Sequence, residues 1–170
     1  MAPMQLTREG DYSIRVLLEL SKRPRGTLVP LEEIARRQLI PAPYLRKIVQ
    51  RLAHTGFVRT FRGRGGGVRL ERPPESITLR QAVEAAEGPI YLNRCLIRPG
   101  ECPLDRVCPV HQVWRHVQDV LLRELDAVTF ADLAATPPRK IRSRREASVS
   151  QKGRKRAKAH TVGGGRNAGA

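Results

Sequence analysis

Residues 41–70 read PAPYLRKIVQRLAHTGFVRTFRGRGGGVRL, and this stretch decides the fold of the chain. After the opening prolines, apolar residues recur every three or four positions as far as Gly56, which predicts a helix over 41–55. Strand-forming residues over 57–61 and 68–70 flank a glycine-rich turn, and this pattern predicts a β-hairpin. The stretch therefore predicts a helix that leads directly into a hairpin.

Two further helices are predicted upstream of this stretch. Residues 6–23 carry apolar side chains at helical spacing, and Thr7 can cap the start of that helix. A shorter helix begins at Pro30, and a tight corner over 38–40 joins it to the helix over 41–55. Two helices joined by so short a corner match a helix-turn-helix, and the hairpin that follows makes it a winged helix.

The helix over 41–55 is the candidate reader of the DNA major groove, because the second helix of a helix-turn-helix takes that position. Its outward face carries five polar side chains that we predict to contact DNA. These are Tyr44, Arg46, Lys47, Gln50 and Arg51.

The hairpin is the candidate wing. Glycine lets a backbone approach another surface closely, and guanidinium groups suit phosphates or the narrow minor groove. The wing residues are Arg59, Arg62, Arg64 and Arg69, together with Gly63, Gly65, Gly66 and Gly67. The turn lacks the Gly-Lys-Ser/Thr end of a phosphate-binding loop, and a strand rather than the helix of a dinucleotide-binding motif follows it. A solvated turn without a ligand is the alternative.

The second half of the chain predicts more helices. A capping box over 78–81 opens a helix that runs through Ala86, and a long helix with an apolar stripe begins at about Pro109. So apolar a helix in a small chain needs a partner surface, and we expect a second copy in a homodimer. The fold class is therefore mainly α with a small β-hairpin wing. The expected regions are a winged-helix domain over 1–72, a cysteine-bearing loop and dimerisation helix over 73–136, and a tail over 137–170.

All three cysteines of the chain fall within fourteen positions. Cys95, Cys102, Cys108 and His111 follow the spacing C-x6-C-x5-C-x2-H, and prolines and a glycine bend the predicted loop over 94–108. Neighbouring arginines favour thiolates, and three thiolates with one imidazole form a ligand set for zinc or for an iron–sulfur cluster. The absence of aromatic residues between the cysteines argues against an RNA-binding finger but not against structural zinc. Three unligated cysteines are a further alternative.

Four motifs occur together in one order. They are Leu6-Thr-x-x-x-Asp-Tyr12, Tyr44-Leu-Arg-Lys-Ile48, Arg62-Gly-x-Gly-Gly-Gly67 and Cys95…Cys102…Cys108-x-x-His111-x-x-Trp114. Residues 4–135 thereby resemble the iron–sulfur cluster regulator family of bacterial winged-helix transcription factors. The resemblance implies a homodimer and a cluster held by the three cysteines, with [2Fe–2S] favoured over [4Fe–4S]. It also implies that cluster loss, oxidation or nitric-oxide attack alters DNA binding.

The resemblance implies two candidates for the fourth cluster ligand. One branch of the family uses a histidine three residues after the last cysteine, and His111 matches that position. Another branch uses an acid near the start of the first helix of the other subunit, and Asp11 matches that position. We favour His111, because its proximity to Cys108 requires no geometry between subunits.

Charge is distributed unevenly along the 170 residues, whose formal net charge is +16. Residues 137–170 carry eleven Lys or Arg against a single acid, Glu146, and few large apolar side chains. We expect this tail to be disordered and to bind a polyanion. A merely solubilising tail is the alternative.

Several classes of protein are excluded. The sequence lacks an apolar run long enough to span a membrane and an apolar signal core, so we expect a cytoplasmic protein. It also lacks a Ser/His/Asp set, a carboxylate pair and an HExxH motif, so we expect no enzyme. The interpretation is a regulator that binds a roughly palindromic DNA operator under control of a redox- or nitric-oxide-sensitive cluster. The alternatives are a constitutive winged-helix repressor with structural zinc or no metal, and a basic nucleic-acid-packaging or adaptor protein.

Overall fold

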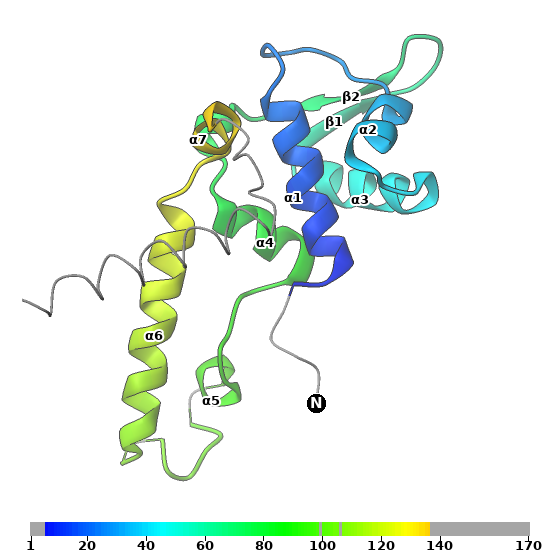
Figure 1. The fold of residues 1–170 in the computed structure, drawn as a ribbon. Helices are drawn as coiled ribbons and strands as arrows, with labels where there is room; N and C mark the ends of the chain where they lie inside the picture. The colour runs from blue at the N-terminus through cyan, green and yellow to red at the C-terminus, as the bar shows by residue number, and fades with distance from the viewer. Residues whose placement is uncertain (1–5, 99, 106, 137–170) are drawn as a thin grey trace, which may run out of the picture. The chain divides into compact units, whose positions relative to one another are not determined.

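The structure is a computed structural model that describes residues 6–98, 100–105 and 107–136. Its elements are α1 (Arg8–Ser21), α2 (Leu31–Gln38), α3 (Ala42–His54), β1 (Val58–Phe61), β2 (Gly67–Leu70), a 3-10 turn (Pro74–Ser76), α4 (Leu79–Glu87), α5 (Arg94–Ile97), α6 (Pro109–Asp126) and α7 (Phe130–Ala135) (Figure 1). The prediction of a mainly helical fold with one small hairpin is confirmed. The predicted tail over 137–170 lies outside the described residues.

One hydrophobic core joins the N-terminal helices, the hairpin and α7. The apolar stripes predicted for α1 and α3 face this core, because their residues recur at helical spacing. Its largest fully buried side chains are Phe130, Leu17, Ile34, Leu45, Ile48, Leu52 and Ile77. Since Phe130 comes from α7, the chain returns after α6 to close the core that α1 begins.

The corner between α2 and α3 has the geometry of a helix-turn-helix. Leu39 ends α2 with a left-handed backbone (φ 53°), and the amide of Ile40 donates to the carbonyl of Ala35. Ile40 is buried, and Pro41 then precedes the first turn of α3. The predicted helix-turn-helix is confirmed, with Gly56 in a left-handed conformation (φ 75°) just after α3.

The hairpin is anchored on the segment that joins α1 to α2. β1 and β2 pair antiparallel with Val58 opposite Leu70, and Val68 forms two further hydrogen bonds of 2.9 Å with the backbone of Val29. A Cβ atom at Gly67 would overlap the carbonyl of Val29, which explains why glycine occupies that position. The wing therefore extends from a base fixed to the core.

A buried carboxylate locks α2 against α1. Glu19 is buried on α1 and accepts hydrogen bonds of 2.8 Å from Arg23 and from Gln38 at the end of α2. Arg23 also donates to Glu33 of α2 at 2.7 Å. That hydrogen bond is the main reason why the pKa of Glu33 lies below its ordinary value of 4.5.

The Arg23–Glu33 contact makes a pH-dependent contribution to stability. The unfolded chain takes up a proton at Glu33 at higher pH than the folded chain does, so this contribution is present above about pH 4.5 and is lost as the pH falls through the lowered pKa. We expect Glu33→Gln to lower the urea midpoint of unfolding near pH 7. At acid pH the midpoints of the variant and of the unsubstituted chain should become equal. The control is Glu32→Gln, which removes the same charge from the same turn; equal pH dependence in both variants would contradict the assignment.

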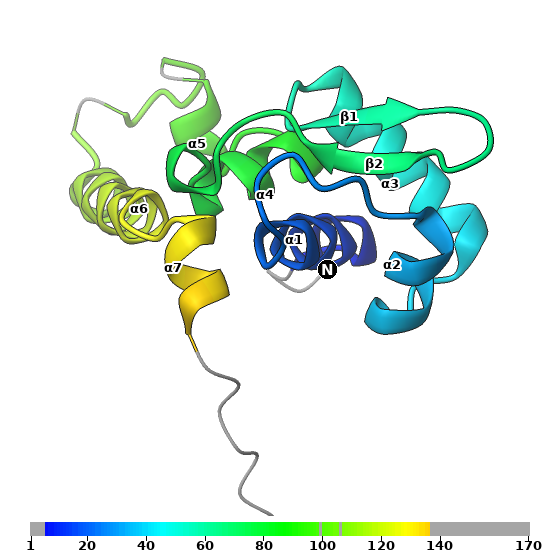
Figure 2. The same ribbon diagram turned by 90° about the horizontal axis from the view of Figure 1, so that it is seen from above.

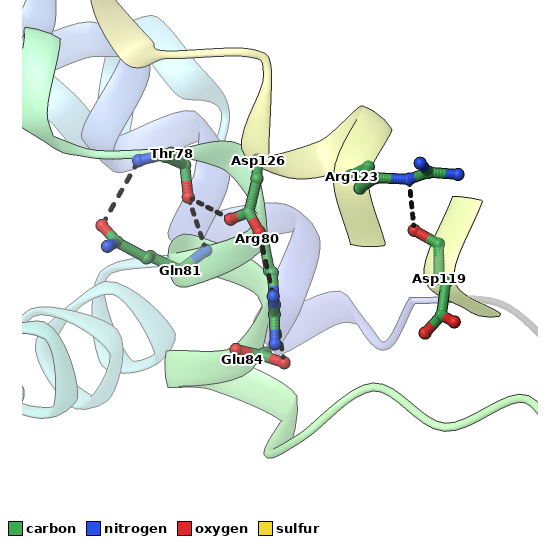
Figure 3. A network of polar contacts seen from close by, with 7 residues as sticks. All are labelled: Thr78, Arg80, Gln81, Glu84, Asp119, Arg123 and Asp126. Atoms are coloured by element: carbon green, nitrogen blue, oxygen red, sulfur yellow. Dashed lines mark hydrogen bonds and ion pairs between the residues drawn. The ribbon is translucent and has the colours of Figure 1, made fainter. Parts of the chain in front are cut away.

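The C-terminal end of α6 is fastened to α4 by a polar network (Figure 3). Arg80 of α4 forms an ion pair of 2.9 Å with Asp126, the last residue of α6, and a second one of 3.2 Å with Glu84. Thr78 caps α4 in the predicted capping box, which is confirmed, and also donates to Asp126. In both views α6 and the hairpin lie on opposite sides of α1 and α4 (Figures 1 and 2). One end of α6 is thus held on the winged-helix unit, while the other end reaches α5 and the cysteine loop.

Candidate metal centre and DNA-binding surface

The three cysteines line one cavity at the N-terminal end of α6. This cavity has a volume of about 650 Å³, and His111 and Trp114 of α6 line it together with Cys95, Cys102 and Cys108. The structure therefore brings together the four predicted metal ligands, which the sequence spreads over three segments. Each cysteine is partly buried and none forms a disulfide bond.

One part of the predicted loop over 94–108 is helical. Residues 94–97 form α5, a single turn whose first amide donates to the side chain of Asn93 at 2.7 Å. The prediction of a continuous loop was wrong here, because one helical turn is too short to display an apolar period. The predicted start of α6 at Pro109 is confirmed, and it places His111 in the first turn.

His111 is the most deeply buried of the four donors, with 6% of its surface exposed. Its Nε2 lies 3.0 Å from the guanidinium of Arg115. Its Nδ1 is buried 3.4 Å from Oδ1 of Asp105 and has no hydrogen-bond partner among the residues that the structure describes. A buried nitrogen left without a hydrogen bond is costly in a folded protein, and three thiols beside it make a donor set that suits a soft metal centre. The residues present therefore fit a thiolate-bound metal or cluster.

The sequence patterns did not lead us to predict Asp105 as a metal donor. Its carboxylate, the sulfur of Cys95 and one ring nitrogen of His111 lie within 4.8 Å of one another. The available signal was an acid between the second and third cysteines, in a run that Pro103 bends. Asp11, the alternative fourth ligand, is exposed on α1 and pairs with Arg15 at 3.3 Å within its own chain.

The outward face of α3 is polar and exposed, because the large aliphatic side chains of the helix turn toward the core; these are Leu45, Ile48, Val49 and Leu52. Arg46, Lys47 and Gln50 are exposed on this face. Tyr44 is also exposed and meets the ring of Tyr12 edge-on, with 6.5 Å between ring centroids. That contact orients the Tyr44 ring at the N-terminal end of the helix.

Arg51 has other partners. Its guanidinium donates to the carbonyl of Ala86 at 2.6 Å and pairs with Glu9 at 3.1 Å. It therefore ties α3 to the C-terminal end of α4 and to α1. We leave Arg51 out of the proposed DNA contacts for this reason.

The wing divides into a base and a tip. At the base, Arg59 pairs with Glu71 at 3.0 Å, and the guanidinium of Arg69 lies 5.0 Å from the centre of the Phe61 ring. At the tip, Arg62 and Arg64 are exposed, and within the described part of the chain neither forms an ion pair. Gly63 and Gly65 adopt left-handed conformations that favour glycine, and Gly66 folds against the carbonyl of Phe61. The tip thus presents two arginines on a tight turn.

Known proteins resemble this chain, which combines a winged helix with a cysteine cavity at the N-terminal end of a long helix. Residues 6–136 match Rrf2, described as an iron-dependent transcriptional regulator. The chain belongs to the Rrf2 family. It is similar to the HTH-type transcriptional regulator NsrR of Bacillus subtilis, with 35% identity over 76% of this chain and 90% of the relative. It is also similar to the regulator IscR of Escherichia coli O139:H28, with 32% identity over 76% of this chain and 80% of the relative.

Solved Rrf2-family structures have the same fold. CymR of B. subtilis, described as the global cysteine regulator, aligns with a TM-score of 0.64 and 28% identity over 78% of this chain and 98% of CymR. IscR of T. potens aligns with a TM-score of 0.61 and 25% identity over 76% of this chain and 85% of that protein. The predicted resemblance and winged-helix class are confirmed.

As a member of the Rrf2 family, the chain is a DNA-binding transcriptional regulator and not an enzyme. Within the described residues, no helix is both long enough and apolar enough to cross a membrane. The match to the Rrf2 family covers the winged helix and the cysteine cavity, whereas the basic residues from 137 onward lie outside it.

Proposed function

We propose that this Rrf2-family regulator binds DNA in the cytoplasm as a homodimer, and that an iron–sulfur cluster in the cysteine cavity controls its affinity. Cys95, Cys102, Cys108 and His111 would hold the cluster, with [2Fe–2S] favoured over [4Fe–4S]. The observation that carries this proposal is the convergence, on one cavity, of three thiols and a buried imidazole nitrogen that has no hydrogen-bond partner in the described part of the chain. When bound, the cluster supplies a centre that oxidants or nitric oxide can attack.

The exposed stripe of α6 supports the dimer. Four valines of this helix keep between 37% and 59% of their surface exposed. They are Val110, Val113, Val117 and Val120. A second copy would cover this stripe, and it would set two reading helices roughly 34 Å apart, one turn of DNA, on a roughly palindromic operator.

The chain connects the cavity to the reading helix through α4 and α6. α6 begins directly after Cys108 and ends at Asp126, which Arg80 holds on α4. The other end of α4 leads into the segment that reaches Cys95, and there the carbonyl of Ala86 accepts from Arg51 of α3. The next residue, Glu87, accepts a hydrogen bond from the amide of Thr7, the cap of α1. A change in the cysteine loop would therefore act on the two helices that position the DNA-reading face.

Ligand substitutions test the cluster assignment. Wild-type chain purified without oxygen is expected to contain iron and acid-labile sulfide, and Cys102→Ser is expected to lose both, because a serine hydroxyl does not replace a soft thiolate ligand. His111→Ala is expected to destabilise the cluster. The matched control is His116→Ala, which removes an exposed histidine from the same helix and should keep iron and sulfide at the wild-type level.

Two outcomes would point to a different ligand or a different protein class. Loss of the cluster in Asp11→Asn but not in His111→Ala would transfer the fourth ligand to the partner subunit. A colourless chain that contains zinc, or no metal, would instead support the constitutive winged-helix repressor.

A further inference from the structure

A second set of metal donors overlaps the cysteine cavity. One sulfur, one carboxylate and one imidazole, from Cys95, Asp105 and His111, lie within 4.8 Å of one another. Among the described residues Cys102 and Cys108 do not belong to this compact group, although they line the same cavity. The compact group is therefore distinct from the set of three thiolates and one imidazole proposed for the cluster.

The spacing of the compact group suits a single ion. A tetrahedral centre with metal–nitrogen and metal–oxygen bonds of about 2.0–2.1 Å separates the two ligand atoms by roughly 3.4 Å. The observed distance between Nδ1 of His111 and Oδ1 of Asp105 is 3.4 Å. With a metal–sulfur bond of about 2.3 Å, the same geometry places the sulfur roughly 3.6 Å from the ligand nitrogen and from the ligand oxygen. Because the present separations do not exceed 4.8 Å, the Cys95 sulfur needs to move by little more than about 1 Å.

The burial of His111 is an independent sign of a ligand. The ring is 94% buried, and Nδ1, which lies 3.4 Å from Oδ1 of Asp105, has no hydrogen-bond partner within residues 6–98, 100–105 and 107–136. Nε2, on the other edge of the ring, contacts Arg115 instead. Arg115 is exposed, so its guanidinium is free to turn away when a metal at Nδ1 fixes the proton on Nε2. Nδ1 is therefore the nitrogen available to a metal.

The other two donors are also held in place. Oδ2 of Asp105 accepts a hydrogen bond of 2.7 Å from the amide of Gly100, which leaves Oδ1 toward His111. The amide of Cys108 donates to the carbonyl of Leu104 at 2.7 Å and closes the turn that carries Asp105. Cys95 lies on α5, and thus the three donors come from three separate, internally bonded segments.

We propose that the cluster-free chain binds one divalent transition-metal ion through Sγ of Cys95, Oδ1 of Asp105 and Nδ1 of His111, with water in the fourth position. One thiolate, one imidazole and one carboxylate suit Zn²⁺ or Fe²⁺ and disfavour Mg²⁺ and Ca²⁺, which need more oxygen ligands. The ion replaces the thiol proton of Cys95, which passes to solvent. Because the two sites share Cys95 and His111, ion and cluster exclude each other. This site does not depend on whether the cluster forms.

Cobalt(II) alone is the probe that tests this site. Cluster-free full-length chain, treated with a chelator under reducing conditions, is titrated with Co²⁺ while the thiolate-to-cobalt charge-transfer band and the visible bands of four-coordinate Co²⁺ are recorded. We expect one Co²⁺ per chain. Cys95→Ser should lose the charge-transfer band, and Asp105→Asn should weaken binding at least roughly tenfold.

The matched variants distinguish this site from the cluster. Asp105→Asn keeps an oxygen for the Gly100 amide while it removes the charged ligand, and circular dichroism verifies that it folds. Cys102→Ser and Cys108→Ser should bind Co²⁺ within about twofold of wild type, although both should lose iron and sulfide in anaerobic protein. Unchanged Co²⁺ affinity in Asp105→Asn would overturn the site. Loss of the charge-transfer band in Cys102→Ser would also overturn the site. Anaerobic wild-type protein that contains no cluster would overturn the proposed function and leave this site unaffected.

Discussion

Alanine at both Arg46 and Gln50 is expected to lower affinity for the operator by roughly 30- to 20,000-fold, because each good base contact contributes about 1–3 kcal/mol. Both side chains are exposed on the face of α3 opposite the buried Leu45 and Val49. Affinity for an unrelated duplex should fall much less, since that binding depends on phosphates. Fluorescence anisotropy at one fixed salt concentration measures both affinities. The operator in this experiment is a duplex that the protein itself selects from a pool of random sequences.

Two control variants accompany this substitution. Arg123→Ala removes one positive charge from the exposed side of α6 and should change neither affinity by more than about twofold. Arg51→Met should instead lower the unfolding midpoint, because Arg51 ties α3 to Ala86 and Glu9. Equal losses on operator and unrelated DNA in the alanine variant would contradict the assignment of α3 as the reading helix.

Deletion of residues 137–170 is expected to weaken binding to every DNA sequence alike. The segment carries eleven Lys or Arg and one Glu. Each phosphate that a protein neutralises adds about 0.9 to the slope of log affinity against log salt, so the deletion should flatten that slope by several units. At about 0.1 M salt we expect a loss of roughly 10- to 1,000-fold on operator and unrelated duplex together.

A tail of the same composition in scrambled order is the control for this deletion. It should restore both the affinity and the salt slope, because the proposed contribution depends on charge and not on sequence. A deletion that changes the preference between two duplexes, or leaves the slope unchanged, would contradict the electrostatic role.

The helices and the hairpin were predictable because local signals specify them. Thr7 and Thr78 cap their helices as expected, and apolar spacing marks the faces of α1 and α3 that pack on the core. α5 was not predicted, because a single helical turn is too short to show a period of apolar residues, and Asn93 is the one residue that signals its start. Boundaries set by caps were therefore more predictable than a short turn between two loops.

The details of the site depend on contacts that no local pattern reveals. Arg51 and Ala86 are 35 positions apart, and only the packed structure brings the guanidinium to that carbonyl. The sequence likewise contains Asp105 and His111, but the turn closed at Cys108 decides that their side chains face each other. The cysteine spacing predicted which residues share a site, and the tertiary structure added the acid.

Whether the cluster controls DNA binding is decided by the operator affinity of one anaerobic preparation, measured before and after removal of its iron and sulfide at the same salt concentration. Control of DNA binding by the cluster predicts equal amounts of iron and acid-labile sulfide in the starting protein, and a change in affinity of roughly 5- to 150-fold when they are removed. Protein that contains no iron, or that binds its operator equally well in both states, would contradict it.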